Sequence, residues 1–269
     1  MKIGFIGGGI MAEAIIKGIL DASLVRPENL LVSDLDSNRL NYIYETLNVV
    51  GVKSNIEVVN KSDIVILAIK PQNIQEVMIK LKGNSISNKS FLSIVAGVRT
   101  KILQDGLGVN SIIRVMPNTP AQIKKGMTVW TSSTGVPSEI LSFSKKMLSV
   151  LGEELYVEDE ILIDMSTALS GSGPAYMFLF MDALINAGIS IGMSKEMSVK
   201  LVRQTLLGSI ELAIGSEFEP AELKKMVTSP GGTTEAALDK FEEGGFSDLV
   251  CESVFAAFER AKFLGGKND

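Results

Sequence analysis

Lys2-Ile-Gly-Phe-Ile-Gly-Gly-Gly-Ile-Met-Ala12 joins a short apolar run to a glycine cluster and to the start of a helical pattern. At this spacing Gly7 permits a tight turn, and Gly9 lets a diphosphate approach the backbone. Ala12 takes the place of a third glycine, where a small side chain keeps the helix close to the strand. The stretch therefore predicts a Rossmann-type strand–turn–helix unit that holds a dinucleotide at the helix N-terminus.

An acidic residue, Asp34, directly follows the next β-rich run, Leu30–Ser33. A carboxylate at this strand end accepts hydrogen bonds from an adenosine ribose and repels a 2′-phosphate. Ser33, Asn38 and Arg39 are close in the chain, and the Arg39 guanidinium could instead pair with such a phosphate. We therefore expect a nicotinamide dinucleotide, with NADH favoured and NADPH left open.

The first 158 residues alternate β-rich runs with amphipathic helical segments. Several runs are apolar at consecutive positions, which is typical of parallel strands buried on both faces. The expected strands are Lys2–Ile6, Leu30–Ser33, Ile64–Ala68, Ser90–Val95 and Ile112–Val115. The expected helices include Ile10–Leu20, Asn38–Leu47 and Ile74–Leu81, with Ser37 as N-cap of the second and Ser138 as N-cap of a later helix that ends at Val150. This alternation predicts a parallel sheet with right-handed helical crossovers.

Beyond residue 160 only helical periodicity remains, in Ile161–Ala168, Pro174–Ala187, Lys195–Gly215, Ala221–Val227, Thr233–Phe241 and Asp248–Leu264. The segment Pro174–Gly188 is apolar almost all round, so it must be covered on every side. We expect a second subunit to help cover it; a central helix of a monomeric bundle is the alternative. The chain is thus predicted to be an α/β N-terminal Rossmann-type domain (residues 1–158, parallel sheet) followed by an all-α substrate-binding and dimerisation domain (residues 159–269).

Histidine is absent, which limits the chemistry more than any other property of the composition. Ser–His nucleophiles, histidine proton shuttles and histidine metal sites are excluded. One cysteine cannot build a thiolate cluster either, so we expect no metal. Catalysis would have to rely on carboxylates, hydroxyls, lysines, backbone dipoles or an organic cofactor.

Charge and cysteine content favour a cytoplasmic protein. The net charge of -5 indicates no excess of basic residues of the kind that binds nucleic acid or an anionic membrane. Cys251 has no partner for an intramolecular disulfide, and we expect it to be a buried structural thiol. Glu13 and Lys17 interrupt the apolar N-terminus, so no signal peptide is expected. The segment Pro174–Gly188 is too short to span a bilayer and contains Asp182, so no membrane is expected as a partner.

Several motifs make the chain similar to a known enzyme family. They are Ile3-Gly-Phe-Ile-Gly-Gly-Gly9, Ala68-Ile-Lys-Pro71, Ala96-Gly97-Val98, Arg114-Val-Met-Pro-Asn-Thr-Pro120, Leu169-Ser-Gly-Ser-Gly-Pro-Ala-Tyr176 and Leu223-Lys-Lys-Met-Val-Thr-Ser-Pro-Gly-Gly-Thr-Thr234. In order and spacing they resemble the pyrroline-5-carboxylate reductases over almost the full length of the chain. The resemblance implies NADPH- or NADH-dependent reduction of 1-pyrroline-5-carboxylate to L-proline, the last step of proline biosynthesis. It also implies a homodimer made through intertwined C-terminal helices, often assembled further into a decamer.

Cofactor contacts are expected along the glycine turn and at the carboxyl ends of the strands, where such sheets bind ligands. The expected residues are Gly7, Gly8, Gly9, Ile10, Met11, Ala12, Ser33, Asp34, Asn55, Ala68, Ile69, Lys70, Pro71, Ala96, Gly97 and Asn118. We expect Lys70 to line the cofactor or face solvent rather than to act in catalysis. The resemblance implies that Asn55 contacts the adenosine ribose and that Asn118 borders the nicotinamide. A plain rigid turn is the alternative for the proline-flanked loop of Asn118.

Two positions depart from the family pattern. Asp34 stands where many relatives carry a small neutral residue or a phosphate-binding set, and this leaves the choice between NADPH and NADH open. Met226 stands where some relatives use a polar residue toward the cofactor.

A second glycine-rich loop suits an anionic substrate. Its glycines can aim N–H groups at a carboxylate, and Thr233 opens a helix whose dipole favours negative charge. The expected substrate-binding residues are Ser229, Pro230, Gly231, Gly232, Thr233 and Thr234. An ordinary helix cap after a Pro-Gly-Gly turn is the alternative.

Two residues are candidates for catalysis because of the resemblance. It implies that the Thr234 hydroxyl lies near the imine nitrogen, where it orients the ring or relays a proton. It also implies that Glu160 reaches the substrate region. A solvated acidic face is the alternative for Glu160, since Glu158, Asp159 and Asp164 are its neighbours.

Two alternative functions fit the sequence less well than this reduction. A different β-hydroxyacid dehydrogenase-like oxidoreductase would need a lysine on the helix after the domain boundary, and none occurs between Ile161 and Asn186. A non-catalytic dinucleotide-binding regulator would have no use for a second anion-binding loop.

Overall fold

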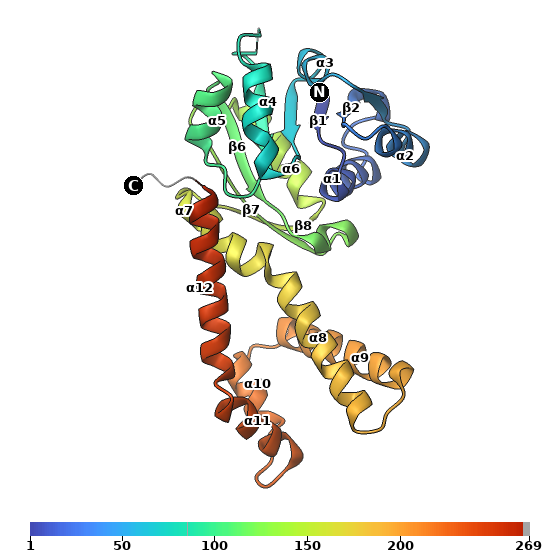
Figure 1. Cartoon of the computed structure of the whole chain (residues 1–269), viewed down its shortest axis with the longest axis vertical. Helices are drawn as coiled ribbons and strands as arrows, with labels where there is room; N and C mark the ends of the chain where they lie inside the picture. The colour runs from blue at the N-terminus through green and yellow to red at the C-terminus, as the bar shows by residue number, and fades with distance from the viewer. Residues whose placement is uncertain (85, 266–269) are drawn as a thin grey trace. The chain divides into compact units, whose positions relative to one another are not determined.

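The computed structural model describes residues 1–84 and 86–265 (Figure 1). By its internal contacts the chain forms two compact units. The first, here called the sheet unit, comprises Met1–Ser172 together with the chain from Ala256 onward. The second, here called the helical unit, comprises Gly173–Phe255.

The sheet unit is built on one eight-stranded sheet of order β3-β2-β1-β4-β5-β6-β7-β8. Its strands are β1 Ile3–Ile6, β2 Leu30–Ser33, β3 Val50–Val52, β4 Ile64–Leu67, β5 Ser90–Ser93, β6 Ser111–Met116, β7 Gly126–Ser132 and β8 Gly152–Tyr156. Neighbouring strands pair in parallel from β3 to β6, whereas β7 is antiparallel to β6 and β8 is parallel to β7.

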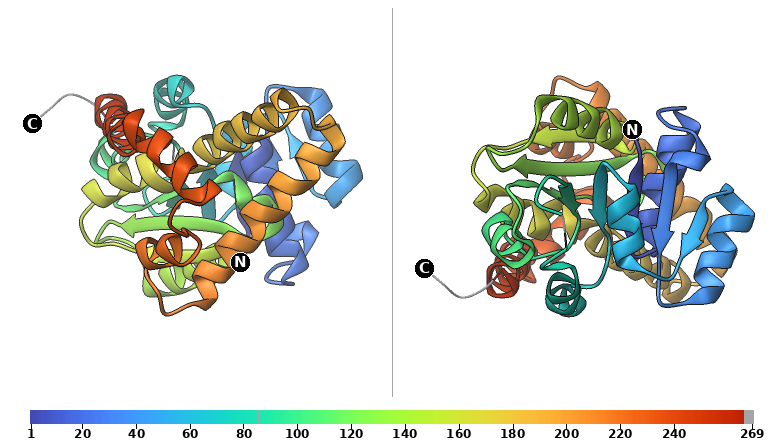
Figure 2. Two further views of the ribbon diagram at one scale, coloured as in Figure 1. Left: turned by 90° about the horizontal axis from the view of Figure 1, so that it is seen from below. Right: turned by 90° about the horizontal axis from the view of Figure 1, so that it is seen from above.

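Helices cover both faces of this sheet (Figure 1, Figure 2). They are α1 Ile10–Asp21, α2 Ser37–Leu47, α3 Asn55–Lys61, α4 Ile74–Leu81, α5 Thr100–Leu107, α6 Ser138–Ser149 and α7 Ile161–Ser166, followed by a π-helical turn at Thr167–Gly171. Alternate residues of β4 face opposite sides, since Ile64 and Ile66 pack with α1, α2 and α6 while Val65 and Leu67 pack with α3, α4 and α5. Burial on both faces explains why these strands are apolar at every position.

The predicted α/β class with a helical C-terminal region is confirmed, with corrections to the sheet. Strands β3, β7 and β8 were not predicted, and the all-parallel sheet is wrong for β7 and β8. The reason is that β7 returns along β6 after only a short loop, which an antiparallel pair allows without a crossover helix. Helices α3 and α5 were also missed.

Two predicted helix caps shift by one residue. Asp36, not Ser37, is the N-cap of α2, because its carboxylate accepts a hydrogen bond from the Asn38 N–H at 2.9 Å. Pro137, not Ser138, is the N-cap of α6, so Ser138 is the first helical residue.

The helical unit contains α8 Gly173–Ser190, α9 Lys195–Gly215, α10 Pro220–Met226, α11 Thr233–Glu243 and the first half of α12 Phe246–Leu264. Helices α8 and α9 pack closely where Gly188 meets Ser198, since a Cβ on Gly188 would lie 2.7 Å from the Ser198 hydroxyl. A second contact is a cluster of three rings, Phe180, Phe241 and Phe246.

The helical unit leaves most of its apolar side chains uncovered within one chain. Between residues 173 and 255 only Ser198 is buried, whereas Leu179 is 73% exposed and Ile214 is 80% exposed. Cys251 is exposed as well, so the prediction of a buried thiol is wrong for the single chain. Exposed apolar area on this scale is typical of a surface that another subunit covers.

Among the residues that the structure describes, one helical stretch, Ile161–Ser190, is by length and composition able to cross a membrane. We predicted that the segment Pro174–Gly188 is too short to do so. The stretch has 30 residues because α7 and the π-helical turn run on into α8. Length therefore does not exclude a span, and a single helix of this kind is weak evidence for one.

The predicted domain boundary after residue 158 differs from the division by contacts. Residues 159–172 group with the sheet, and the helical unit begins at Gly173. The physical reason is that α7 buries Ile163 and Asp164 completely within the sheet unit. The division into domains at residue 158 stays a prediction.

Candidate functional site

The carboxyl ends of four strands lie along one edge of the sheet. Ile6 pairs with Ser33 on one side and with Leu67 on the other, and Leu67 pairs with Ser93. Each of these residues is the last of its strand. The segments that follow therefore lie side by side, and all of them were predicted to hold the dinucleotide.

The glycine turn after β1 has the geometry that a diphosphate requires. Gly7 has φ +98°, and a Cβ there would lie 2.4 Å from the Ala68 carbonyl oxygen. A Cβ on Gly9 would meet nothing within 4 Å, so the space in front of Gly9 is open. Gly9 is also the N-cap of α1, where no side chain caps the first N–H groups. Because these donors and the helix dipole are left for a ligand, the residues fit a dinucleotide diphosphate.

Of the three residues that follow the glycines, Ala12 is buried, whereas Ile10 and Met11 are accessible to solvent. Ala12 is 1% exposed and lies in the main apolar cluster, as a residue that brings helix and strand together must. Ile10 is 64% exposed and Met11 is partly exposed. An exposed isoleucine at a helix start is available to an apolar ligand surface.

Two charged side chains bind the backbone of Gly8, one at its N–H and the other at its carbonyl oxygen. Asp34 Oδ2 accepts a hydrogen bond from the Gly8 N–H at 2.7 Å, and its Oδ1 accepts one from the Asp36 N–H at 2.9 Å. Arg39 Nε donates to the Gly8 carbonyl oxygen. The structure therefore places Asp34 and Arg39 against the glycine turn, and the predicted contact of Asp34 with the adenosine ribose stays a prediction.

Ser33 and Asn55 lie together beside this strand end. The Ser33 hydroxyl is 2.7 Å from Asn55 Oδ1 and 3.3 Å from the Phe5 carbonyl oxygen. Asn55 is the first residue of α3, whose N-cap is Ser54. The two residues that were expected near the adenosine ribose are thus adjacent, and the sugar contact itself stays a prediction.

The segment after β4 presents Ala68, Ile69, Lys70 and Pro71. Ala68 and Ile69 are half-buried against the glycine turn, where the Ile69 side chain lies close to Gly7. Lys70 is exposed and is the N-cap of the short 3-10 turn Pro71–Asn73. Its place at the sheet edge agrees with a lining or solvated function.

The end of α12 covers the segment after β5. The sequence does not indicate this contact. Gly97 has φ +75°, and a Cβ there would lie 2.5 Å from the Leu264 Cβ. Gly97 is therefore buried, while Ala96 is half-buried. The last turn of α12 is packed directly on residues expected to bind the cofactor.

Asn118 ties three segments together through its side-chain amide. Its Nδ2 donates to the Ser170 carbonyl oxygen at 3.0 Å, and its Oδ1 accepts from the Met127 N–H at 2.9 Å. The loop after β6 is thereby joined to β7 and to the π-helical turn. Asn118 is a positioning residue by these contacts, and a contact with the nicotinamide stays a prediction.

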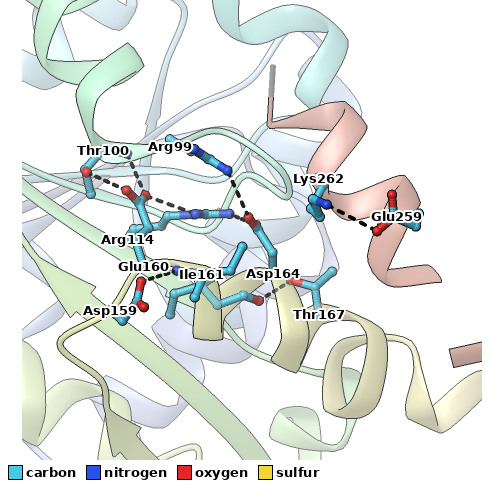
Figure 3. Close-up of polar contacts among 11 residues, drawn as sticks. Arg99, Thr100, Arg114, Asp159, Glu160, Ile161, Asp164, Thr167, Glu259 and Lys262 are labelled. Atoms are coloured by element: carbon cyan, nitrogen blue, oxygen red, sulfur yellow. Dashed lines mark hydrogen bonds and ion pairs between the residues drawn. The ribbon is translucent and has the colours of Figure 1, made fainter. Parts of the chain in front are cut away.

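Glu160 makes three contacts within the sheet unit (Figure 3). Its Oε1 accepts from the Thr100 N–H at 2.8 Å and from Arg114 Nη1 at 3.0 Å, and its Oε2 accepts from the Thr100 hydroxyl at 2.9 Å. Thr100 is the first residue of α5, whose N-cap Arg99 offers no side-chain cap. Glu160 therefore caps α5 from a distant part of the chain.

A buried ion pair lies next to Glu160 (Figure 3). Arg114 is 1% exposed and Asp164 is fully buried, and Arg114 Nη2 donates to Asp164 Oδ1. Arg99 Nη2 lies 4.0 Å from the other Asp164 oxygen. Two carboxylates thus balance two guanidinium groups, as burial of these charges requires. The solvated acidic face considered for this region holds only for Glu158 and Asp159, which are exposed.

Sequence reasoning missed Arg99, Thr100, Arg114 and Asp164 as a group. One signal was present, because Arg114 is the only charged residue in the apolar strand segment Ser111–Met116. A lone arginine in a strand buried along its whole length requires a buried anionic partner.

The loop Ser229–Thr234 joins α10 to α11 in the helical unit. Gly231 has φ +70°, and its N–H donates to the Glu235 carboxylate at 2.6 Å. Gly232 is the N-cap of α11 without a side-chain cap, and a Cβ there would lie 2.4 Å from the Ser229 hydroxyl. A carboxylate of the chain itself already binds one N–H of this loop, so the donors fit a carboxylate ligand.

The threonines that follow open α11. Thr233 is exposed and Thr234 is half-buried. The six residues of the predicted substrate loop are therefore brought together at one helix N-terminus.

Family models match the two halves of the chain. Residues 160–264 match the model described as pyrroline-5-carboxylate reductase dimerisation. Residues 2–97 match the model described as NADP oxidoreductase, coenzyme F420-dependent. The first match agrees with the uncovered apolar surface of the helical unit and indicates an oligomer.

Relatives are similar along the whole chain. The pyrroline-5-carboxylate reductase of Synechocystis sp. is 38% identical over 267 residues, with 99% of each chain covered. That of Pseudomonas aeruginosa is 39% identical over 264 residues, covering 98% of this chain and 96% of the relative. The crystal structure of Plasmodium falciparum pyrroline carboxylate reductase with NADP bound has a TM-score of 0.90 at 32% identity, covering 99% of this chain and 98% of that one. Similarity of this extent shows that the chain belongs to the pyrroline-5-carboxylate reductase family.

Proposed function

We propose that this protein reduces 1-pyrroline-5-carboxylate to L-proline with NADPH or NADH, as the last step of proline biosynthesis. The observation that carries the proposal is the presence of two helix N-termini without a side-chain cap in one chain of this family. One follows the glycine turn at the sheet edge, and the other follows Gly232 in the helical unit. A dinucleotide diphosphate suits the first, and a substrate carboxylate suits the second.

The sheet unit would hold the dinucleotide through the residues predicted for it. The open N-terminus of α1 supports binding of the diphosphate at the glycine turn. The adjacent Ser33, Asp34 and Asn55 support binding of the adenosine ribose at the end of β2. When bound, the reduced nicotinamide supplies the hydride for the imine carbon.

The loop from Ser229 to Thr234 would hold the substrate. The uncapped N–H groups at the start of α11 bind its carboxylate, and the Thr234 hydroxyl orients the ring at the imine nitrogen. A protonated imine is already electrophilic, so the reaction needs neither a metal nor a histidine acid. This agrees with a chain that contains no histidine.

Glu160 was predicted to act beside Thr234. Its contacts with Thr100 and Arg114 support a positioning function, because they hold the carboxylate at the N-terminus of α5 and on the buried Arg114 guanidinium. We therefore propose Thr234 as the catalytic residue of this chain, and direct participation of Glu160 stays a prediction.

We also propose that the chain acts in the cytoplasm as a homodimer that assembles further into a decamer, without a nucleic-acid or membrane partner. The exposed apolar side chains of the helical unit and the matching dimerisation model support the dimer. Analytical ultracentrifugation tests the assembly, and a monomer that stays stable on dilution would contradict it.

The decisive assay follows the oxidation of NADPH and of NADH in the presence of racemic 1-pyrroline-5-carboxylate. We expect turnover with at least one cofactor and L-proline as the product. Absence of turnover with both cofactors would contradict the proposed reaction. An α-keto acid serves as a second substrate in the same assay, since a dehydrogenase of the β-hydroxyacid type would reduce a ketone.

A further inference from the structure

The guanidinium of Arg39 is held between the glycine turn and α1. Besides its bond to Gly8, its Nη2 donates to Glu13 Oε2 and lies 3.4 Å from the Gly9 carbonyl oxygen. The Tyr42 ring lies against the group, with its centroid 4.9 Å from Arg39 Cζ. The Tyr42 hydroxyl donates to the other Glu13 oxygen at 3.2 Å. Glu13 thus supplies a neutralising charge to Arg39 and is itself fixed by Tyr42.

This ion pair lies beside the strand end that is proposed to bind the adenosine ribose. Arg39 belongs to the first turn of α2, which follows β2 and Asp34. The side chains of Arg39 and Glu13 are 22% and 25% exposed, so the pair is reachable from solvent but only partly screened by it. A ligand bound at this edge of the sheet would lie close to both the Arg39 guanidinium and the Glu13 carboxylate.

A guanidinium that is already paired offers little net attraction to a 2′-phosphate. To bind the phosphate, Arg39 would have to leave Glu13, or the phosphate would have to approach a second negative charge. The Asp34 carboxylate adds a third negative group at the same strand end. A ribose with a free 2′-hydroxyl neither breaks the pair of Arg39 with Glu13 nor brings a second negative charge close to these carboxylates. Its hydroxyl can instead donate a hydrogen bond to Asp34.

We propose that Glu13 is a cofactor-specificity residue: it holds Arg39 away from a 2′-phosphate and, together with Asp34, makes the site favour NADH over NADPH. The inference rests on the cofactor site proposed above. Glu13 acts through Arg39 and is a positioning residue, since the described contacts of its carboxylate are with Arg39 and Tyr42.

A second cation, Lys53, lies near this strand end. Ser33 pairs with Val52 in the ladder, so Lys53 follows β3 at the edge where Asp34 follows β2. Its side chain is exposed. If Lys53 rather than Arg39 met the phosphate, removal of the Glu13 charge would have no effect that depends on Arg39. The test therefore needs a variant of each cation.

The test measures the dissociation constants of NADPH and NADH for the full-length protein without substrate, by quenching of nicotinamide fluorescence. We expect the wild type to bind NADH more tightly. Glu13→Gln should shift the affinity ratio toward NADPH by about threefold to tenfold, the effect of one partly exposed charge interaction. Glu13→Ala should shift the ratio in the same direction. Adding Arg39→Gln to Glu13→Gln should return the ratio to the wild-type value.

Glu76→Gln is the control, because it makes the same change of charge in an exposed ion pair on α4. It should leave the ratio unchanged. Both cofactors share the diphosphate contacts, so a general weakening of the glycine turn cancels in the ratio.

An unchanged ratio in both Glu13 variants would overturn the proposal. So would a shift that survives Arg39→Gln, or a shift that only Lys53→Gln reverses, because the phosphate would then be bound elsewhere. Failure of the wild type to bind either dinucleotide would contradict the cofactor site itself and the inference with it, and this result is distinguishable from binding with an unchanged ratio.

Discussion

Arg114 donates a hydrogen bond to Glu160 at 3.0 Å although 46 positions separate them in the chain. Arg114 lies in the middle of β6, and Glu160 immediately precedes the first helix of the C-terminal region. The contact therefore fixes where the helical part of the chain begins on the sheet. Substitutions in this network and in the proposed substrate loop test what these residues contribute.

Asp164→Asn should destabilise the sheet unit. The change leaves the Arg114 guanidinium buried with one charged partner fewer, and breaking a buried pair in this way costs about 3 kcal/mol or more. Urea unfolding measures the free energy. Glu158→Gln is the control, because it removes an exposed carboxylate from the same segment. Equal stability of the two variants would show that the buried pair contributes nothing.

Glu160→Gln separates positioning from catalysis. The carbonyl oxygen of a glutamine can still accept from the Thr100 N–H, so we expect lower stability and a kcat within about threefold of the wild type. Loss of a general acid or base would lower kcat by about 100-fold to 10,000-fold. Steady-state kinetics at saturating substrate decides between the two. A loss of kcat on the larger scale in a folded variant would assign Glu160 a catalytic function after all.

Thr234→Ala should lower kcat with little change in the dissociation constant of the cofactor. The hydroxyl is proposed to contact only the imine ring, so its loss removes an interaction that matters in the transition state. Thr228→Ala is the control, since the hydroxyl of Thr228, just after α10, donates to the Lys224 carbonyl oxygen and has no proposed contact with substrate. If kcat of Thr234→Ala equals that of the control, Thr234 has no part in the mechanism.

Glu235→Gln should lower the KM for 1-pyrroline-5-carboxylate. The Glu235 carboxylate accepts the Gly231 N–H at 2.6 Å, so it competes with the substrate carboxylate for that donor and repels it. Removing one charge at a partly exposed site should lower KM by about twofold to fivefold. Glu242→Gln, an exposed position near the other end of α11, controls for the change of net charge. A KM that rises in Glu235→Gln alone would show that Glu235 supports the loop instead.

Gly97→Ala should destabilise the protein more than Gly108→Ala. The two glycines have nearly the same φ, +75° and +73°, so both variants carry the strain of a left-handed alanine, about 1 to 2 kcal/mol. Only Gly97 faces Leu264, whereas Gly108 has open space around it. Thermal unfolding of both variants gives the difference. Equal melting temperatures would mean that the last turn of α12 does not pack on Gly97.

Local sequence patterns predict the beginning of this fold well. The unit from β1 to α1 was predicted because a fully apolar strand, a required glycine and an amphipathic helix follow one another within a few residues. Helix α9 was predicted at its observed bounds, Lys195–Gly215, from its helical periodicity, and the structure adds Ser194 as its N-cap. Such signals depend only on neighbours in the chain.

The features that were missed depend on distant residues. The direction of β7 is set by its pairing with β6, and its own residues do not encode it. Asp36 and Ser37 are both good N-cap residues, so only the backbone geometry decides between them. The partners of Glu160 could not be predicted either, because the residues it joins lie on β6 and α5. The sequence indicates that acidic residues gather near Glu160, and only the fold shows which of them are buried.

The passage of α12 from the helical unit back to Gly97 makes the helical unit an insertion rather than an appendage. The polypeptide leaves the sheet unit after Ser172 and re-enters it at Ala256, so two covalent connections join the units instead of one. A reporter group attached to the last turn of α12 would consequently sense the dinucleotide-binding half of the molecule, and removing that turn would remove the contact of α12 with Gly97.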